Sequence, residues 1–157
     1  MGDSRQYEIR DARRADVPAI ARLAAEFAQY MRALGDVTQF RLDAKALERD
    51  GFGSDQAFRG LVMEYAGVVV GYLLYHDGYD TDAACRVLFV ADLFVTKEAR
   101  GQGIGTALMH KVSEIEAARG ARQLVWTVDQ HNVEAQRFYK RIGADFVESL
   151  RLMCLDV

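Results

Sequence analysis

The sequence predicts one α/β domain over residues 1–157, with helices packed on a mixed β-sheet. Strand-like runs dominate the first half of the chain, and strands alternate with amphipathic helices after Leu88. Half of the 157 residues are hydrophobic and 27% are charged, as in ordinary globular proteins. A chain of this length buries roughly 70% of its unfolded surface, which suits a single core.

The composition of six segments is typical of β-strands: residues 7–10, 58–65, 68–76, 84–95, 124–128 and 146–155. The dipeptide Ala66-Gly67 predicts a tight hairpin turn between the second and third segments. The polar residues 76–82 predict a loop between the third segment and the fourth.

Four further segments are predicted to be helices. The first is capped by Asp16, has Pro18 in its first turn and ends at Gly35. Its hydrophobic stripe consists of Val17, Ile20, Leu23, Phe27, Met31 and Leu34. The other helices are expected over residues 43–50, 104–120 and 132–143, the last of them capped by Asn132.

A glycine-rich loop, Arg100-Gly-Gln-Gly-Ile-Gly105, joins the fourth strand to a helix. The first amides of a helix have no intrahelical acceptor and the helix dipole adds partial positive charge, so such a loop favours phosphate. Glycine is needed because a side chain would keep the phosphate away from those amides. The following residues, Thr106-Ala107, match neither the Lys-Ser/Thr of a P-loop nor the third glycine of a dinucleotide fingerprint.

Composition and spacing narrow the partners. A net charge of −3 argues against a nucleic-acid-binding surface. The sequence has no apolar run of membrane-spanning length and no signal-peptide pattern. We therefore expect a cytoplasmic protein that binds no membrane. Cys85 and Cys154 are expected to be reduced core thiols. His76, His110 and His131 share no ligand spacing, so no metal is expected.

Two motifs follow one another in the second half of the chain, Arg100-x-x-Gly103-x-Gly105 and Asn132-x-x-Ala135-x-x-Phe138-Tyr139. The first resembles the acyl-CoA pyrophosphate loop of the GNAT superfamily of N-acetyltransferases, and the second resembles that superfamily's second signature. The resemblance implies a mostly antiparallel central sheet flanked by helices. It also implies that residues 91–95 contain a bulge and splay from residues 124–128, which forms an acetyl-CoA cleft.

The resemblance further implies which residues contact acetyl-CoA: Leu93, Phe94, Val95, Arg100, Gly101, Gln102, Gly103, Ile104, Gly105, Thr106, Asn132, Ala135, Phe138, Tyr139 and Lys140. Several have plainer interpretations that stay open. Asn132 is explained as a helix cap, Phe138 as a core residue, and Lys140 and Arg100 as solvated cations.

Two residues are candidates for proton transfer. The match to the superfamily's Phe-Tyr pair implies that Tyr139 protonates the departing thiolate. The alternative is a structural tyrosine with a buried ring and a solvent-exposed hydroxyl. An incoming primary amine must lose a proton, and either Asp92 or an ordered water would accept it. The alternative for Asp92 is an ion pair with a neighbouring cation. Neither cysteine has a nearby His pattern to activate it, so direct attack by the amine is expected.

A closer resemblance is to the spermidine/spermine (diamine) N-acetyltransferase family, through residues 47–53, Tyr79-Asp80, residues 92–105 and residues 138–144. It implies a homodimer acting on a small cationic amine. That family has a catalytic glutamate where this chain has Ala91, and its C-terminal segment is longer than residues 146–157. A protein or peptide acetyltransferase and a non-catalytic acyl-CoA sensor therefore remain alternatives.

The acceptor side is predicted from a group of acidic residues. Tyr79, Asp80, Asp82 and Asp92 are the candidate substrate-binding residues, and Asp77 adds a further negative charge. Carboxylates of one sign in a cleft raise the local concentration of a cationic substrate. The plainer interpretation is that Asp77, Asp80 and Asp82 are turn residues held by local hydrogen bonds.

Overall fold

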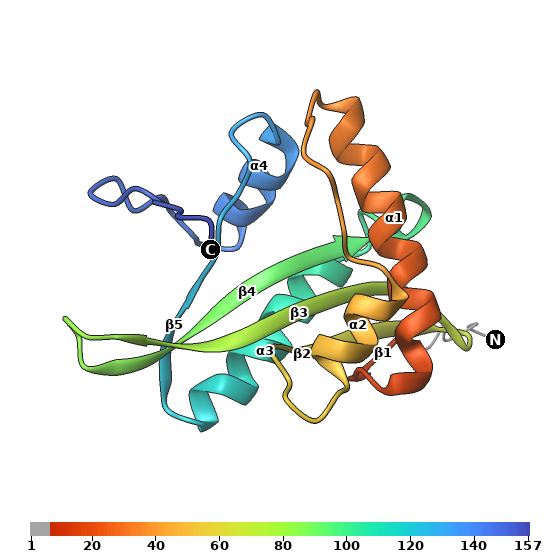
Figure 1. The fold of residues 1–157 in the computed structure, drawn as a ribbon, viewed down its shortest axis with the longest axis horizontal. Coiled ribbons are helices and arrows are strands. Elements are labelled where there is room, and N and C mark those ends of the chain that lie inside the picture. The colour runs from red at the N-terminus through yellow and green to blue at the C-terminus, as the bar shows by residue number, and fades with distance from the viewer. Residues whose placement is uncertain (1–6) are drawn as a thin grey trace. The chain divides into compact units, whose positions relative to one another are not determined.

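The computed structural model describes residues 7–157, which form two compact units that divide after Thr127. The first unit contains the β-sheet and three α-helices, and the second contains helix α4 (Val133–Arg141) followed by irregular chain (Figure 1). A single domain over residues 1–157 therefore stays a prediction.

The sheet of the first unit has five strands in the order of the sequence. They are β1 (Tyr7–Asp11), β2 (Arg59–Tyr65), β3 (Val68–Asp80), β4 (Cys85–Val95) and β5 (Ala121–Val125). The first three pairings are antiparallel and the pairing of β4 with β5 is parallel. The predicted mixed, mostly antiparallel sheet is confirmed.

Helices cover both faces of this sheet (Figure 1). Helices α1 (Val17–Ala33) and α2 (Ala44–Gly51) lie on one face, and α3 (Ile104–Ala118) packs against strands β2 to β5 on the other. The α1 face buries Ile20, Leu23, Val62, Tyr72 and Phe94, and the largest fully buried side chains also include Leu61, Leu73, Leu108 and Val112. No helix within residues 7–157 is long and apolar enough to cross a bilayer.

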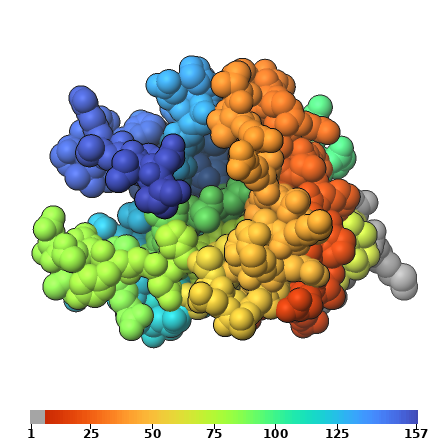
Figure 2. Space-filling model, viewed as in Figure 1, coloured from red at the N-terminus to blue at the C-terminus, as the bar shows by residue number. Residues whose placement is uncertain are grey.

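The prediction of a polar loop at residues 76–82 is wrong. Strands β3 and β4 stay paired as far as Asp80 opposite Cys85, and only residues 81–84 form the turn. Polar side chains do not interrupt a strand pair at a solvated hairpin, because the backbone hydrogen bonds of the ladder are independent of them. The tip of this hairpin extends beyond α2 and away from α1 (Figure 2).

Two predicted strands near the C-terminus are also corrected. Strand β5 is Ala121–Val125, three residues earlier than expected, and residues 146–155 form no strand. Hydrophobic residues such as Leu152 and Met153 are exposed there, because alternation favours a strand only where a neighbouring edge supplies hydrogen bonds. Cys85 is a buried free thiol, as predicted, whereas Cys154 is exposed and is not in the core.

The caps of the helices differ from one another. Asn132 caps α4 through its side-chain oxygen, as predicted, and Asp43 caps α2 in the same way. Asp16 precedes α1 but makes no side-chain cap; its carboxylate accepts the Arg13 amide and pairs with the Arg10 guanidinium instead. A charge-assisted pair with two parallel hydrogen bonds is stronger than a neutral cap, which explains the exchange.

Candidate active site

A β-bulge on β4 determines which way Asp92 points. Tyr75 pairs with Val90 and Leu74 pairs with Asp92, so Ala91 is an extra residue on β4. Residues directly opposite in an antiparallel pair share a face, and Leu74 belongs to the core on the α1 face. If β4 were a regular strand with no bulge at Ala91, alternation would place Asp92 on the same face as Val90. The bulge thus brings the Asp92 carboxylate to the α1 face of the sheet.

Within residues 7–157, the far half of β4 is paired with a strand on one side only. Parallel pairing with β5 ends at Phe89 opposite Val125, whereas β4 remains paired with β3 up to Val95 (Figure 1). The stretch Leu93–Phe94–Val95, expected to contact acetyl-CoA, lies in this half. A strand with an unpaired edge offers backbone hydrogen-bonding groups to an extended ligand.

The carboxylate of Asp92 has a neutral partner. The Tyr72 hydroxyl on β3 donates a 2.6 Å hydrogen bond to Asp92 Oδ2. Burial raises the pKa of Asp92 to about 6, although the hydrogen bonds from Tyr72 and from the Leu93 amide act in the opposite direction. Burial and the negative charge of Asp92 raise the pKa of Tyr72 well above its usual value, so the phenol keeps its proton. Asp92 is thus poised to exchange a proton near neutral pH.

The glycine loop follows β4 and leads into α3. Gly101 and Gly103 have φ values of 75° and 78°, in the left-handed region that glycine adopts without strain. A Cβ atom at either position would meet no atom within 4 Å, so the space above these amides is open. The amides of the first helical residues, from Ile104 to Thr106, have no intrahelical acceptor. The loop therefore has the shape and the donors that a pyrophosphate requires.

Side chains of the loop fasten it to the sheet. Arg100 Nε donates to the Val95 carbonyl at 3.0 Å, and its guanidinium lies over the rings of Tyr30 and Phe94, 4.9 and 5.3 Å from their centroids. Gln102 accepts a hydrogen bond from the Tyr7 hydroxyl at the start of β1. Arg100 is therefore partly buried and held, rather than the solvated turn residue of its plainer interpretation.

The remaining predicted acetyl-CoA residues lie on α4 in the second unit. Asn132 is buried, and its side-chain oxygen accepts the Ala135 amide at 3.1 Å. The rings of Phe138 and Tyr139 are half-buried neighbours, with centroids 5.1 Å apart. Lys140 Nζ lies 3.9 Å from Asp145 Oδ1 and 5.1 Å from the Phe146 ring centroid.

The predicted acceptor residues are not all brought together. Asp80 and Asp82 lie at the tip of the β3–β4 hairpin, roughly 20 Å along the strand from Asp92 at the usual rise per residue. Asp80 Oδ1 accepts the amides of Asp82 and Ala83, which matches the plainer turn interpretation, and Tyr79 is 62% exposed. Asp77 pairs with Arg59 at 2.6 Å and faces Arg119 at 3.6 Å, so its charge is compensated.

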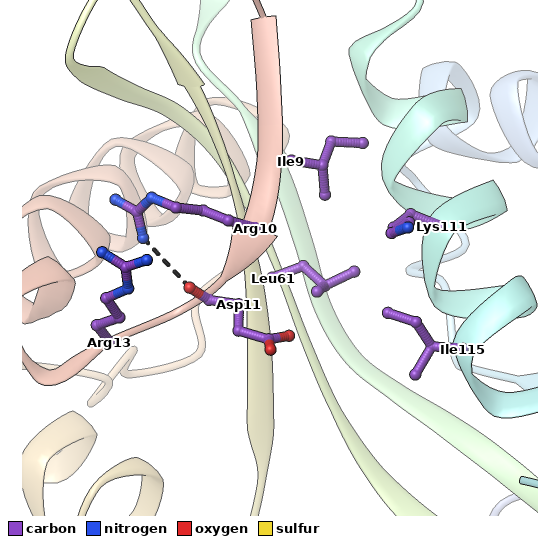
Figure 3. A pocket seen from close by; sticks show the side chains of 7 residues that line it. All are labelled: Ile9, Arg10, Asp11, Arg13, Leu61, Lys111 and Ile115. Atoms are coloured by element: carbon purple, nitrogen blue, oxygen red, sulfur yellow. Dashed lines mark hydrogen bonds between the residues drawn. The ribbon is translucent and has the colours of Figure 1, made fainter.

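A hollow of about 490 Å³ lies elsewhere, between the edge strand β1 and α3 (Figure 3). Ile9, Leu61, Lys111 and Ile115 face one another across it, and Arg10, Asp11 and Arg13 complete its lining. None of the predicted catalytic or acetyl-CoA residues lines it. We therefore place the candidate active site at Asp92 and the glycine loop, not in this hollow.

Comparison with known proteins identifies the family. A model of the acetyltransferase (GNAT) family matches residues 20–144. A thialysine N-epsilon-acetyltransferase of Bos taurus is 37% identical over 144 residues, which are 87% of this chain and 82% of that protein. Spermidine/spermine N(1)-acetyltransferase-like protein 1 of Homo sapiens is 30% identical over 145 residues, 88% of this chain and 20% of that protein.

A similar fold occurs in an aminoglycoside N-acetyltransferase solved in complex with CoA, with a TM-score of 0.72, 16% identity and coverage of 97% of this chain and 95% of that one. This chain belongs to the GNAT family of acetyltransferases and is an acetyl-CoA-dependent N-acetyltransferase. Within that class, its relatives confirm the resemblance to the spermidine/spermine (diamine) N-acetyltransferases.

Sequence reasoning missed Tyr72. It lies in an apolar run of β3, where an aromatic residue is expected to be core, and its ring is indeed fully buried against Phe94. The available signal was chemical, because a buried tyrosine hydroxyl needs a partner. Identifying Asp92 as that partner required the register and the bulge, which residue spacing does not reveal.

Proposed function

We propose that this enzyme transfers the acetyl group of acetyl-CoA to a primary amino group of a small cationic amine. The observation that carries this proposal is Asp92, a partly buried carboxylate with a pKa of about 6 on the strand that leads into the glycine loop. Its side-chain partner among the described residues is the neutral phenol of Tyr72. The names of the relatives, a thialysine and a spermidine/spermine-like acetyltransferase, support a cationic acceptor.

The loop would hold the pyrophosphate of acetyl-CoA. Amides of residues 102–106 would donate to phosphate oxygens, and the helix dipole of α3 would add partial positive charge. Arg100 would contribute its charge while keeping the loop fixed to β4. The open edge of Leu93–Phe94–Val95 would pair with the pantetheine arm, and the backbone there would polarise the thioester carbonyl.

The proton transfers would involve two residues of opposite role. Asp92, largely ionised at pH 7, would accept the proton that the ammonium group must lose before attack. The amine nitrogen then bonds to the acetyl carbon and the carbon–sulfur bond breaks. Tyr139 would give its proton to the thiolate. The nitrogen would lose its second proton as the amide forms, and that proton would restore the Tyr139 phenol. The proton on Asp92 would pass to solvent, so charge and protons balance without a covalent enzyme intermediate. Asn132, Ala135, Phe138 and Lys140 would complete the cofactor contacts from α4.

The cationic amine acceptor would be attracted by the negative charges of aspartate side chains. In addition to Asp92, we retain Tyr79, Asp80 and Asp82 at the hairpin tip as proposed acceptor-binding residues, and Asp80 also holds its own turn. Resemblance to the diamine enzymes supports a homodimer, and we propose that the chain works as one domain in the cytoplasm without a bound metal.

A paired substitution tests the cofactor site. Gly103 and Gly120 both have positive φ, 78° and 92°, and open space beside the Cα atom, but they lie at opposite ends of α3. A glutamate has similar strain and charge at either position, whereas only Gly103→Glu places bulk and negative charge where phosphate belongs.

Isothermal titration calorimetry with CoA should show a loss of affinity on the order of 10²-fold or more for Gly103→Glu and little change for Gly120→Glu. Unchanged affinity in a folded Gly103→Glu protein would overturn the proposed cofactor site.

A thiol-release assay with acetyl-CoA and a panel of diamines, thialysine, neutral amines and peptides then identifies the acceptor class. A neutral amine or a peptide turning over faster than every cationic small molecule would refute that part.

A further inference from the structure

The buried hydroxyl of Tyr72 donates a hydrogen bond to the Asp92 carboxylate. It is fully buried, with its ring packed 6.3 Å from that of Phe94 and its hydroxyl on Asp92. A phenylalanine would fill the same apolar space without the need to satisfy a buried hydroxyl. The polar atom is therefore best explained by the carboxylate that it contacts.

The contact fixes one oxygen of the carboxylate. Tyr72 stands opposite Phe94 in the ladder, one diagonal step from Asp92, and both side chains lie on the α1 face. A ring locked in the core cannot follow a moving partner, so the 2.6 Å bond restrains rotation of the Asp92 carboxylate.

Other charged groups near this site have separate partners. On α1, Glu26 accepts a hydrogen bond from the Thr96 hydroxyl, and beyond β4, Arg100 is bonded to the Val95 carbonyl. Among the described residues, the groups that act on the pKa of Asp92 are the Tyr72 hydroxyl and the Leu93 amide, besides burial itself. Tyr72 is thus the titratable side chain that governs this carboxylate.

We propose that Tyr72 is a positioning residue for the proton acceptor: its hydroxyl holds Asp92 Oδ2 so that Oδ1 faces the incoming amine. This inference rests on the proposed function of Asp92. A hydrogen bond that is stronger to the carboxylate than to the neutral acid also keeps Asp92 ionised at lower pH. Tyr72 would therefore set the lower pH limit of activity as well as the geometry.

The test compares Tyr72→Phe with Tyr75→Phe. Both tyrosines are buried on β3, but Tyr75 lies on the opposite face, beneath the Arg59 guanidinium. The kcat/KM for thialysine is measured from pH 5 to pH 9 with saturating acetyl-CoA. In Tyr72→Phe the acidic limb should move upward by about one unit, since a hydrogen bond to a charged group is worth that much. The KM for acetyl-CoA should stay unchanged, and Tyr75→Phe should keep the wild-type limb.

Direct titration provides a readout that does not depend on activity. The carboxyl carbon of Asp92 is followed by NMR in the wild type and in Tyr72→Phe, together with the ring Cζ of Tyr72 in the wild type. We expect the Asp92 midpoint to rise in the variant, and the Tyr72 signal to titrate with the same midpoint as Asp92. The wild-type measurement applies even if Tyr72→Phe does not fold.

Failure of this inference is distinct from failure of the proposed function. If the wild type transfers acetyl groups and Asp92→Asn removes the acidic limb, an unmoved limb in Tyr72→Phe overturns the role of Tyr72 alone. The role of Tyr72 is also overturned if its ring signal does not change as Asp92 titrates. If Asp92→Asn keeps full activity and the same pH profile, the proposed proton acceptor itself is wrong.

Discussion

Two aspartates in the first unit have partners of different charge: Asp16 is paired with a cation, whereas Asp92, the proposed proton acceptor, is held by a neutral phenol. Asp16, just before α1, is only 7% exposed and accepts two hydrogen bonds from Arg10 at 2.7 and 2.9 Å. The Arg10 guanidinium lowers the pKa of Asp16, with the Arg13 amide acting in the same direction. Arg10 also binds Glu64 on β2, so the network joins the start of α1 to the sheet edge.

Asp92 differs in the nature of its partner. It has a neutral phenol in place of a guanidinium, and burial raises its pKa to about 6. A carboxylate compensated by a buried cation is held in one charge state, whereas one held by a neutral donor can gain and lose a proton near neutrality. Burial alone therefore does not suit a carboxylate to proton transfer; the charge of its partner matters as well.

The largest expected effect separates the two residues by activity. Asp92→Asn should lower kcat on the order of 10²- to 10³-fold, because the amide cannot accept the amine's proton. Asp16→Asn should keep kcat within about twofold under conditions where the protein is folded, since Arg10 and Asp16 serve structure. Steady-state kinetics with saturating acetyl-CoA measure both. Similar losses in the two variants would remove the distinction drawn between them.

The second prediction extends the contrast to the two tyrosines. Tyr72 would hold a proton acceptor, whereas Tyr139 would donate a proton in the reaction itself. Tyr139→Phe should lower kcat on the order of 10²-fold with little change in the KM for acetyl-CoA, and it should leave the acidic limb of the pH profile in place. An unchanged kcat would mean that water or substrate protonates the thiolate.

How far the sequence predicted this site depends on the residue. The glycine loop was predictable because backbone amides that are to meet a phosphate need glycine. The structure adds a second reason, the positive φ of Gly101 and Gly103. The helix cap at Asn132 followed from local side-chain chemistry. The pairing of Tyr72 with Asp92 depends on strand register and on one extra residue at Ala91, and register is a property of two strands together.

The failures have the same origin. Residues 146–155 have the composition of a strand but no partner edge in the structure, and residues 76–80 have the composition of a loop but are paired with β4. In both cases the neighbouring backbone decided the outcome, not the segment itself. Asp16 is similar, because its expected cap was displaced by an arginine from another element.

The third prediction concerns stability, for which substitution of Asp16 should be more damaging than substitution of Asp92, the reverse of the order expected for activity. Asp16→Asn should lower the free energy of unfolding by roughly 3 kcal/mol at pH 7, because Arg10 loses a buried partner. Asp92→Asn should raise it, by at most roughly 3 kcal/mol, because no charge is buried at that position. Urea unfolding at matched temperature measures both changes.

The pH dependence of these differences has opposite signs. The pKa of Asp16 is lowered on folding, so its contribution is present above about pH 4 and disappears as the pH falls through its folded pKa. The pKa of Asp92 is raised, so its contribution is present below about pH 4 and is lost as the pH rises through about 6. Curves for the two variants that change with pH in the same direction would contradict the assignment.

The smallest expected effect tests whether acidic residues outside these two partnerships attract the acceptor. Asp77 is compensated by Arg59 and Arg119, so steering would depend on Asp80 and Asp82 at the hairpin tip. For a cationic amine, kcat/KM should fall about threefold as added salt shortens the Debye length from ~10 Å toward ~3 Å. The double variant Asp80→Asn, Asp82→Asn should start from a lower kcat/KM and lose most of that salt dependence.

A matched control removes two charges elsewhere, in the double variant Glu8→Gln, Glu114→Gln, whose carboxylates are exposed on β1 and α3. It should keep the wild-type salt dependence, because long-range attraction depends on where the charges lie and not only on their sum. Acetyl-CoA is an anion, so its own salt trend should not share the sign of the amine's. If both double variants lose the salt dependence equally, net charge explains the attraction and the hairpin tip has no special role. If neither loses it, the attraction resides at Asp92, and the contrast between a compensated and an uncompensated carboxylate then covers substrate capture as well as proton transfer.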